Sequence, residues 1–343
     1  MKILLITDTC ENNTNGVVTT LKELMRGVYE SNNHTITSVS PEQFLTIPCP
    51  TYNEIRLTVN PWKVKEYINK EKADIVHIAT EGPLGIAARI YCANHCIPFV
   101  TSYHTKFPEY IKLRFPFIPI SWSYAFMRWF HGPAERTFVT TESMKKELRE
   151  NDVAKNQTVV WPRGVDTEFF APTSVKRYSK ENEKPTGLYV GRISVEKNLE
   201  DFLKLEEINK VVVGDGPDRR KLEKKYPDAQ FLGFKYGSEL VEAYNKADVF
   251  VFPSKTDTFG LVMLEAMACG TPVAAYSVTG PKDIIVEGRN GGTCDDLKLS
   301  VRKALKINRQ RCRDHTVKTH SWERGVQIYI EALEKIVNFN QSY

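Results

Sequence analysis

SKTDTFGLVMLEAMACGTP, residues 254–272, is the stretch that decides the fold of this chain. The apolar run ADVFVFP before it (247–253) is predicted to form a buried strand. The polar side chains of residues 254–258 favour the start of a helix, and residues 260–270 are apolar or small except for Glu265. The stretch therefore predicts a strand, a tight turn and a buried helix that carries one acid.

Such a turn predicts a ligand site at the start of the helix. The free N–H groups and the positive dipole end of a helix N-terminus attract anions. Asp257 precedes the helix and Glu265 lies inside it, eight positions further on. Two carboxylates repel an anion but accept hydrogen bonds from hydroxyls, so the stretch suits a ligand that carries both a phosphate and a sugar. The alternative is a buried helix whose acid pairs with a donor in the core.

Asp257 and Glu265, within DTFGLVMLE, resemble the Glu-X7-Glu motif of the family-4 retaining glycosyltransferases, which have the GT-B fold. Asp257 stands where most of these enzymes have Glu. The similarity is to bacterial-type α-mannosyltransferases and glycolipid-forming glycosyltransferases. It implies an α/β protein of two Rossmann-like, doubly wound parallel-sheet domains that face each other across a cleft. The acceptor-side domain is expected to comprise residues 1–168 plus 320–343, because the last helix returns to it, and the donor domain residues 169–319.

Length and composition fit two soluble domains. The 343 residues allow two full cores, and the hydrophobic content of 41% and charged content of 26% are ordinary for a soluble protein. The net charge of +5 permits anionic ligands or an acidic membrane surface and does not require nucleic acid. No apolar stretch approaches the roughly 18 residues of a spanning helix, and MKILLITDTC is expected to be a first strand, not a signal peptide.

The seven cysteines are odd in number and scattered, which predicts reduced thiols and a cytoplasmic location. Cys92, His95 and Cys96 could suggest a metal site. They lie on a predicted helix, however, where a structural role is favoured, so we expect no metal at this place.

The first domain opens with a strand, a glycine loop and a helix, predicted at residues 2–7, 8–16 and 17–29. Further strands and helices alternate after it, which predicts a parallel sheet covered on both faces. The loop lacks the G-x-G-x-x-G fingerprint, so a nicotinamide-dependent oxidoreductase is disfavoured. The resembling family has a glycine pair facing the donor diphosphate in this loop, and this chain has only Gly16.

His104 follows a predicted strand at residues 97–102, at the edge of the sheet where such folds bind ligands. A lone histidine is commonly a structural hydrogen-bonding group. Here it matches, in SYHT, the histidine that the family places beside the donor sugar. The resemblance implies a neutral imidazole that bonds the 6-position of the sugar or stabilises an oxocarbenium-like charge. It also places Glu81, Tyr103 and Lys106 on the acceptor side.

Arg192 and Lys197 lie in GRISVEKN, and the corresponding residues of the family bracket the donor pyrophosphate. Two fixed cations at a glycine turn can neutralise a leaving nucleoside diphosphate. The motifs SYHT, GVDTEFF, GRISVEKN and DTFGLVMLEA occur in the family's order. The remaining donor contacts that we assign are Gly16, Gly214, Gly233, Phe234, Thr258, Phe259, Gly260 and Leu261.

Residues 107–130 hold nine aromatic side chains, with Lys112, Arg114 and Arg128 among them. Interleaved basic and aromatic residues are typical of a segment that lies on a membrane. The alternative is an aromatic-rich crossover in the core, and nucleic-acid binding is disfavoured because there is no long basic stripe. In residues 321–336, apolar positions at helical spacing predict an amphipathic last helix.

The sequence is therefore interpreted as a retaining, metal-independent glycosyltransferase, which we expect in the cytoplasm, with peripheral contact to the membrane surface as the hypothesis for residues 107–130. It would move a mannose- or glucose-type hexosyl unit from a UDP- or GDP-linked sugar to a lipid or glycan hydroxyl. In this hypothesis His104, Asp257 and Glu265 are the catalytic residues, and no cofactor is needed. The alternatives are an inactive or non-transferase GT-B protein: a nucleotide-sugar binding protein, an epimerase or a phosphorylase.

Overall fold

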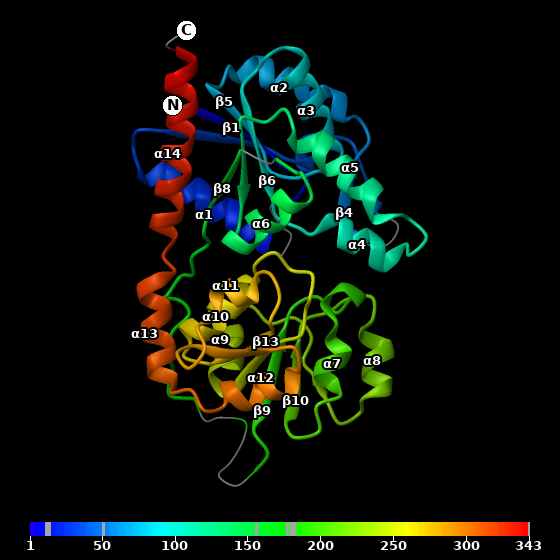
Figure 1. The fold of residues 1–343 in the computed structure, drawn as a ribbon, viewed down its shortest axis with the longest axis vertical. Helices are drawn as coiled ribbons and strands as arrows, with labels where there is room; N and C mark the ends of the chain where they lie inside the picture. The colour runs from blue at the N-terminus through cyan, green and yellow to red at the C-terminus, as the bar shows by residue number, and fades with distance from the viewer. Residues whose placement is uncertain (11–14, 50–51, 155–156, 176–177, 179–182, 342–343) are drawn as a thin grey trace. The chain divides into compact units, whose positions relative to one another are not determined.

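The computed structural model describes residues 1–10, 15–49, 52–154, 157–175, 178 and 183–341. Two compact units form, which Figure 1 shows as two sheets with their helices. Unit 1 contains Met1–Lys112, Pro116–Arg163 and Trp322–Tyr343, and unit 2 contains Leu113–Phe115 and Gly164–Ser321.

Unit 1 is built on a six-stranded parallel sheet with the strand order β2-β1-β5-β6-β7-β8. Its strands are β1 (Lys2–Ile6), β2 (Thr35–Val39), β5 (Ile75–Ile78), β6 (Phe99–Tyr103), β7 (Arg136–Val139) and β8 (Thr158–Val160). The helices of this part of the chain are α1 (Gly16–Glu30), α2 (Val64–Glu71), α3 (Pro83–Asn94), α4 (Phe107–Arg114), α5 (Ile120–His131), α6 (Glu142–Glu150) and α14 (Trp322–Gln341). An antiparallel pair, β3 (Thr46–Cys49) and β4 (Tyr52–Thr58), and two short 3₁₀ helices, η1 (Pro41–Gln43) and η2 (Pro61–Lys63), complete the unit.

The last helix, α14, packs on unit 1, as predicted from the resemblance. Its apolar stripe is buried in a core cluster that also contains Trp161 and Phe138. Gly27 of α1 has no side chain at the point where α14 crosses it, and a Cβ there would lie 2.5 Å from a methyl group of Val326. Tyr329 of α14 is completely buried in the same cluster. The helix is therefore part of the core of unit 1.

Unit 2 repeats the architecture with the strand order β11-β10-β9-β12-β13-β14, all parallel. Its strands are β9 (Thr186–Val190), β10 (Asn209–Val213), β11 (Gln230–Phe231), β12 (Val249–Phe252), β13 (Val273–Tyr276) and β14 (Gly291–Cys294). The helices are η3 (Val195–Lys197), α7 (Leu199–Leu203), α8 (Arg219–Lys225), α9 (Gly237–Lys246), α10 (Leu261–Ala268), α11 (Pro281–Ile284), α12 (Leu297–Ala304) and α13 (Arg309–Thr319). Both sheets are doubly wound, which confirms the predicted fold class.

Residues 247–272 form β12, a turn and α10, as predicted. All four residues of β12 are buried, as expected for a parallel strand covered on both faces. Met263, Leu264 and Met267 of α10 are also buried in the larger core cluster of unit 2. The predicted polar cap is wrong. The N-cap of α10 is Gly260, whose φ of 98° lies in a region that favours glycine, and a Cβ there would approach the ring of Phe252 to 2.8 Å.

Residues 107–130 form α4, α5 and the loop between them, with both buried and exposed apolar side chains. Tyr124, Met127 and Phe130 are buried in unit 1, so one side of α5 belongs to the core. Phe117 is 81% and Trp122 71% exposed, so apolar side chains also face outward. In the part of the chain that the structure describes, no helix is both long and apolar enough to cross a membrane.

None of the seven cysteines forms a disulfide bond within the described part of the chain. Cys92 is buried in the core of unit 1 and Cys96 is exposed just beyond the end of α3. Among the described residues, no group of three or more His, Cys, Asp or Glu side chains could hold a metal ion.

Candidate functional site

Two loops of unit 2 lie together at the carboxyl ends of the neighbouring strands β9 and β12. This edge of a parallel sheet is where such folds bind ligands. Lys197, from the first loop, donates a hydrogen bond from Nζ to Oδ1 of Asp257 in the second loop, at 2.5 Å. The two side chains are only 22% and 15% exposed. Two residues that the sequence assigned to the donor site are thus brought into direct contact.

Four further hydrogen bonds join the same two loops to each other and to α7. The side-chain hydroxyls of Ser254 and Thr256 donate to the carbonyl oxygen of Glu196, at 3.3 and 3.1 Å. Asn198 donates from Nδ2 to the carbonyl of Pro253, at 3.1 Å, and to Oδ2 of Asp201, at 2.7 Å. Because these contacts flank Lys197 and Asp257 on both sides, they hold the ion pair in place.

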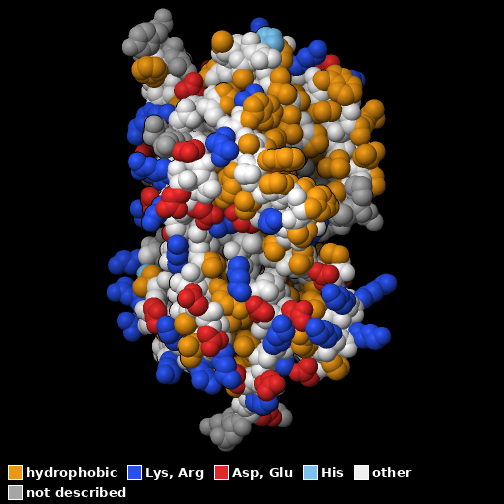
Figure 2. All heavy atoms as spheres, turned by 45° about the vertical axis from the view of Figure 1, so that its right-hand side comes forward, with side chains coloured by type: hydrophobic (Ala, Val, Ile, Leu, Met, Phe, Trp, Pro, Cys, Tyr) orange, Lys and Arg blue, Asp and Glu red, His pale blue; other side chains and the backbone are white. Residues whose placement is uncertain are grey.

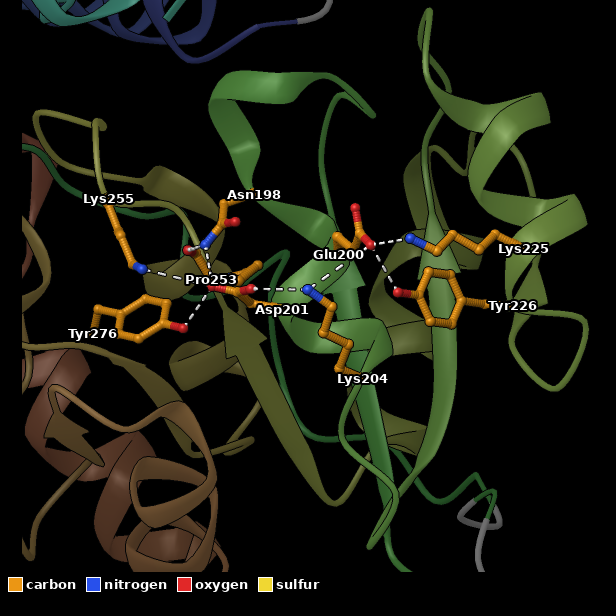
Figure 3. A network of polar contacts seen from close by, with 9 residues as sticks. All are labelled: Asn198, Glu200, Asp201, Lys204, Lys225, Tyr226, Pro253, Lys255 and Tyr276. Atoms are coloured by element: carbon orange, nitrogen blue, oxygen red, sulfur yellow. Dashed lines mark hydrogen bonds and ion pairs between the residues drawn. The ribbon is translucent and has the colours of Figure 1, made fainter.

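Figure 3 shows how Asn198 is anchored from below by a network of charged and aromatic side chains. Asp201 accepts hydrogen bonds from Asn198 and from the hydroxyl of Tyr276, the latter at 2.7 Å, and lies 3.6 Å from Nζ of Lys255. The same Nζ lies 4.1 Å from the centre of the Tyr276 ring. The network connects α7 to the ends of β12 and β13, so the position of Asn198 depends on three elements.

Replacing Asn198 with Gly is expected to weaken nucleoside-diphosphate binding roughly 10-fold and to lower the free energy of unfolding of unit 2 by about 1–2 kcal/mol, the usual contribution of two hydrogen bonds. Gly preserves the left-handed backbone of this residue (φ 51°) and removes only the side-chain bonds. Titration calorimetry and thermal melting measure the two effects. Asn32→Gly is the matched control, because Asn32 is exposed and also has a positive φ of 59°. Equal behaviour of the two variants would contradict the role of the Asn198 side chain.

Three predicted glycine turns meet beside these loops. Gly191 donates its N–H to the carbonyl of Val213, at 3.0 Å, and Gly214 donates to the carbonyl of Gly233, at 2.8 Å. A Cβ on Gly214, whose φ is 130°, would lie only 2.0 Å from the carbonyl oxygen of Gly191. Arg192 follows in this turn, with its carbonyl accepting a bond from the hydroxyl of a buried tyrosine. The loops after β9, β10 and β11 therefore form one continuous edge.

Phe234, the predicted contact of the donor base, is 55% exposed beside this edge. Its ring stacks on that of Tyr236, with centroids 5.9 Å apart and the planes 20° from parallel. The pair offers an exposed aromatic surface for a planar ring. Tyr236 was not identified from the sequence, since a single tyrosine at the start of a helix gives no signal.

The start of α10 carries four more predicted donor residues. Thr258 and Phe259 are buried, Leu261 is half-buried, and Gly260 is the N-cap. Among the described residues, no side chain caps this helix. The first N–H groups of a helix have no intrahelical partner. Phosphate oxygens are suited to accept from them.

Tyr244 of α9 positions Glu265, because its hydroxyl donates a hydrogen bond to Oε2 of the carboxylate at 2.7 Å. Tyr244 is completely buried. Burial raises the pKa of the Glu265 carboxyl to about 7, against the opposing effect of the Tyr244 hydrogen bond. Within the described part of the chain, the Tyr244 hydroxyl is the donor to this carboxylate, which has remaining acceptor capacity for hydroxyl groups. Tyr244 lies in no motif and was missed by the sequence analysis.

In unit 1, His104 directly follows β6, as expected. Arg163 donates a hydrogen bond from its terminal nitrogen to Nδ1 of His104, at 3.1 Å. Burial, followed by the positive charge of Arg163, lowers the pKa of His104 well below its ordinary value. The imidazole is therefore neutral, in the form that the resemblance implied for it.

The three residues predicted on the acceptor side are all engaged inside unit 1. Tyr103 is the last residue of β6 and is 1% exposed. Lys106 forms an ion pair with Glu147, at 2.7 Å, and Glu81 lies 3.5 Å from a ring nitrogen of His131. Their acceptor role stays a prediction.

The first loop adds one residue that the sequence analysis did not single out. Asp8 accepts hydrogen bonds from the backbone N–H groups of Leu84, at 2.7 Å, and Gly85, at 3.1 Å, and so caps the start of α3. Gly16 is exposed at the start of α1. Residues 11–14 of the predicted loop lie outside the described residues.

Two family models match this chain, one in each half. Residues 14–169 match the model described as Glycosyltransferase Family 4, and residues 171–313 match the model described as Glycosyl transferases group 1. Together they extend over most of both units and include the loops described above.

Individual proteins show the same similarity. The sulfoquinovosyl transferase of Arabidopsis thaliana is 37% identical over 267 residues, which are 72% of this chain and 51% of that protein. A GDP-mannose-dependent alpha-mannosyltransferase of Mycobacterium tuberculosis is 31% identical over 71% of this chain and 65% of that protein. This chain thus spans between about half and two thirds of the length of these relatives.

The structure of sucrose-phosphate synthase from Thermosynechococcus elongatus has the same fold, with a TM-score of 0.79, 18% identity and 98% of both chains covered. The fold predicted from the motifs is thereby confirmed across both units.

Proposed function

Because this chain belongs to the family-4 and group 1 glycosyltransferases, we propose that it transfers a hexosyl unit from a nucleoside-diphosphate sugar to an acceptor hydroxyl, with retention and without a metal. The observation that carries the proposal is the contact between Lys197 and Asp257. It unites a cation suited to a phosphate and an acid suited to sugar hydroxyls at one edge of the sheet. Glu265, with its raised pKa and its tyrosine partner, lies eight residues further along.

Each group has a separate part in the proposed reaction. Arg192 and Lys197 neutralise the charge that develops on the leaving diphosphate, together with the N–H groups at the start of α10. Asp257 accepts hydrogen bonds from the sugar and Glu265 from the ribose hydroxyl pair. His104 bonds the sugar. The leaving group departs and the acceptor attacks on the same face of the sugar, so no enzyme nucleophile is required.

The relative from Mycobacterium tuberculosis that depends on GDP-mannose favours a GDP-linked mannosyl donor, and a UDP-linked hexose is the other candidate. The test is a screen of UDP- and GDP-hexoses with the purified protein, in buffer with EDTA, for donor hydrolysis and for transfer to lipid or glycan acceptors. We expect turnover of one donor class, with the anomeric configuration of the donor retained in the product. Donor binding without turnover would instead favour a nucleotide-sugar binding protein. Turnover that requires inorganic phosphate would identify a phosphorylase.

The exposed aromatic side chains of α5 and of the loop between α4 and α5 support a lipid acceptor at a membrane surface. Figure 2 shows hydrophobic side chains gathered on a broad face of unit 1, with a few basic groups among them. The outward-facing apolar side chains of this segment in unit 1 are Phe117, Ile120, Trp122 and Trp129, and Leu113 and Phe115 of unit 2 are also exposed. Lys112, Arg114 and Arg128 lie in the same segment. Aromatic and basic side chains in one surface segment suit the boundary between lipid headgroups and acyl chains.

The double variant Phe117→Ser, Trp122→Ser is expected to reduce flotation with anionic liposomes by roughly 10-fold or more, since each large side chain would contribute more than 1 kcal/mol of burial. Flotation at low and high salt measures the effect. Tyr29→Ser is the matched control, because Tyr29 is 80% exposed on α1 of the same unit. Failure of the unaltered protein to float at low salt would refute membrane contact and leave the transferase proposal standing.

A further inference from the structure

Arg163 is a buried cation with an unusual set of partners. The residue is 2% exposed and its guanidinium carbon lies 3.8 Å from the centre of the Trp161 ring. One terminal nitrogen donates to the carbonyl of Trp161, at 3.0 Å, and the other donates to Nδ1 of His104, at 3.1 Å. The His104 ring in turn lies edge-on to Trp161, with centroids 6.2 Å apart. The three side chains form one packed group within unit 1.

The chemistry of the guanidinium decides the state of the histidine. A guanidinium has only N–H donors and no acceptor, and although burial lowers the pKa of Arg163 to about 9, the group keeps its proton near neutral pH. Nδ1 of His104 must therefore offer its lone pair, and the single ring proton of the neutral imidazole must be on Nε2. A second ring proton, on Nδ1, would point the N–H of His104 at the N–H of Arg163 and would place two positive charges side by side. We infer that Arg163 is a positioning residue, which holds His104 as the neutral Nε2–H tautomer.

Stacking on Trp161 alone does not explain why a cation is buried at position 163. Buried cations are ordinarily paired with an acid, because removal of the charge from water is costly. Among the described residues, no carboxylate forms an ion pair with Arg163; its polar partners there are the Trp161 carbonyl and the His104 ring. His77 also acts on His104, and it is itself buried and held neutral because burial lowers its pKa to about 3. The guanidinium of Arg163 therefore acts on the His104 imidazole, through both its hydrogen bond and its positive charge.

The resemblance left two roles open for His104: a hydrogen bond to the sugar, or stabilisation of an oxocarbenium-like charge. The Nε2–H tautomer favours the hydrogen bond, an argument that rests on the proposed function. An Nε2–H group donates to an oxygen and has no lone pair at that nitrogen to offer to a developing cation. His104 therefore donates a hydrogen bond to an oxygen of the transferred sugar, and the resemblance implies that this oxygen is the 6-hydroxyl. A donor that lacks this oxygen loses one hydrogen bond, which corresponds to roughly a 10-fold loss in kcat/KM.

The tautomer can be observed without any activity. The protein is labelled with ¹⁵N-histidine, and the ring signals of His104 are assigned by comparison with His104→Gln and followed from pH 5 to 8. The unaltered protein is expected to show the Nε2–H pattern throughout, with no titration. In Arg163→Met, which keeps the length of the side chain and removes the charge and the donors, His104 is expected to populate both tautomers. Arg163→Lys, which restores the charge, should recover part of the Nε2–H signal.

Arg89→Met is the matched control. Arg89 also stacks on a tryptophan of unit 1, with its guanidinium carbon 4.1 Å from the Trp129 ring, and also donates to the carbonyl of that tryptophan, at 2.5 Å. Loss of this stack is expected to lower stability without a change in the His104 signals. An Nδ1–H signal for His104 in the unaltered protein would overturn the inference even if no Arg163 variant folds. An unchanged tautomer in Arg163→Met would do the same.

A second measurement separates this inference from the proposed function. With an active donor, the unaltered protein should prefer the 6-hydroxyl sugar to its 6-deoxy analogue, and Arg163→Met should lose most of that preference. Correct NMR signals with no turnover of any donor would refute the transferase proposal and leave the role of Arg163 intact. Turnover with an Nδ1–H histidine would refute the role of Arg163 alone.

Discussion

Glu265→Gln is expected to make unit 2 more stable and, at the same time, to weaken nucleoside-diphosphate binding by on the order of 100-fold. The loss of affinity follows because hydrogen bonds from hydroxyls to a charged acceptor contribute about 1.5–3 kcal/mol. The gain in stability follows because burial raises the pKa of this carboxyl from 4.5 to about 7. Keeping it ionised above pH 7 therefore costs roughly 3 kcal/mol in the folded state. Gln removes that cost and still accepts the bond from Tyr244.

The pH dependence of the free energy of unfolding independently tests the raised pKa of Glu265. Between pH 4.5 and 7 the folded protein binds the Glu265 proton and the unfolded chain does not, so this residue makes stability fall as the pH rises through that range. Melting curves of the unaltered protein should show this loss, and the Glu265→Gln curves should lack its contribution. Titration calorimetry at pH 8 measures the affinity. A variant that is less stable than the unaltered protein at pH 8, or that binds nucleoside diphosphate equally well, would refute the assignment of Glu265.

Lys197→Met is expected to reduce nucleoside-diphosphate binding by on the order of 100-fold and to lower the free energy of unfolding of unit 2 by roughly 1–3 kcal/mol. The first effect follows because the cation that neutralises the diphosphate is lost. The second follows because Asp257, with its side chain 15% exposed, loses its ion pair with Lys197. Calorimetry and urea unfolding measure the two effects.

The double variant Lys197→Met, Asp257→Asn separates these effects. Removal of both charges should recover most of the lost stability, because no partly buried charge is left unpaired, but it should not recover binding. Lys235→Met is the matched control. It breaks an ion pair of the same unit between Lys235, which precedes α9, and Glu239 in the first turn of α9, at 3.0 Å, and should change stability by less than about 1 kcal/mol. A double variant that binds nucleoside diphosphate normally would contradict the role of Lys197.

Much of the fold could be predicted from the sequence because parallel strands buried on both faces are continuous apolar runs. KILLI in β1 and VFVF in β12 are such runs, and each precedes a glycine turn and a helix. The start of α10 was predicted wrongly, since polar residues ahead of a helix suggest a side-chain cap. The turn needs a left-handed residue packed against Phe252 instead, which only glycine satisfies there.

The candidate site was predictable only as far as its motifs reach. The order of the motifs identified Lys197, Asp257 and Glu265, but it assigned Lys197 to phosphates and Asp257 to sugar hydroxyls. Their direct ion pair joins residues 60 positions apart, and pairing across that separation has no sequence signal. Tyr244 and Arg163 were missed for the same reason. Each is a single residue on a different element, and its importance comes from a partner that the fold brings to it.

The position of α14 at the end of the chain also affects when the core of unit 1 can be completed during synthesis. The core of unit 1 includes Tyr329 and Leu333, which pack with Phe138 and Trp161. Unit 2 is complete at residue 321, before α14 begins. On a ribosome, the part of the unit 1 core that α14 covers therefore stays exposed until the second unit has emerged. The core of unit 1 is completed only after all of unit 2 has been synthesised.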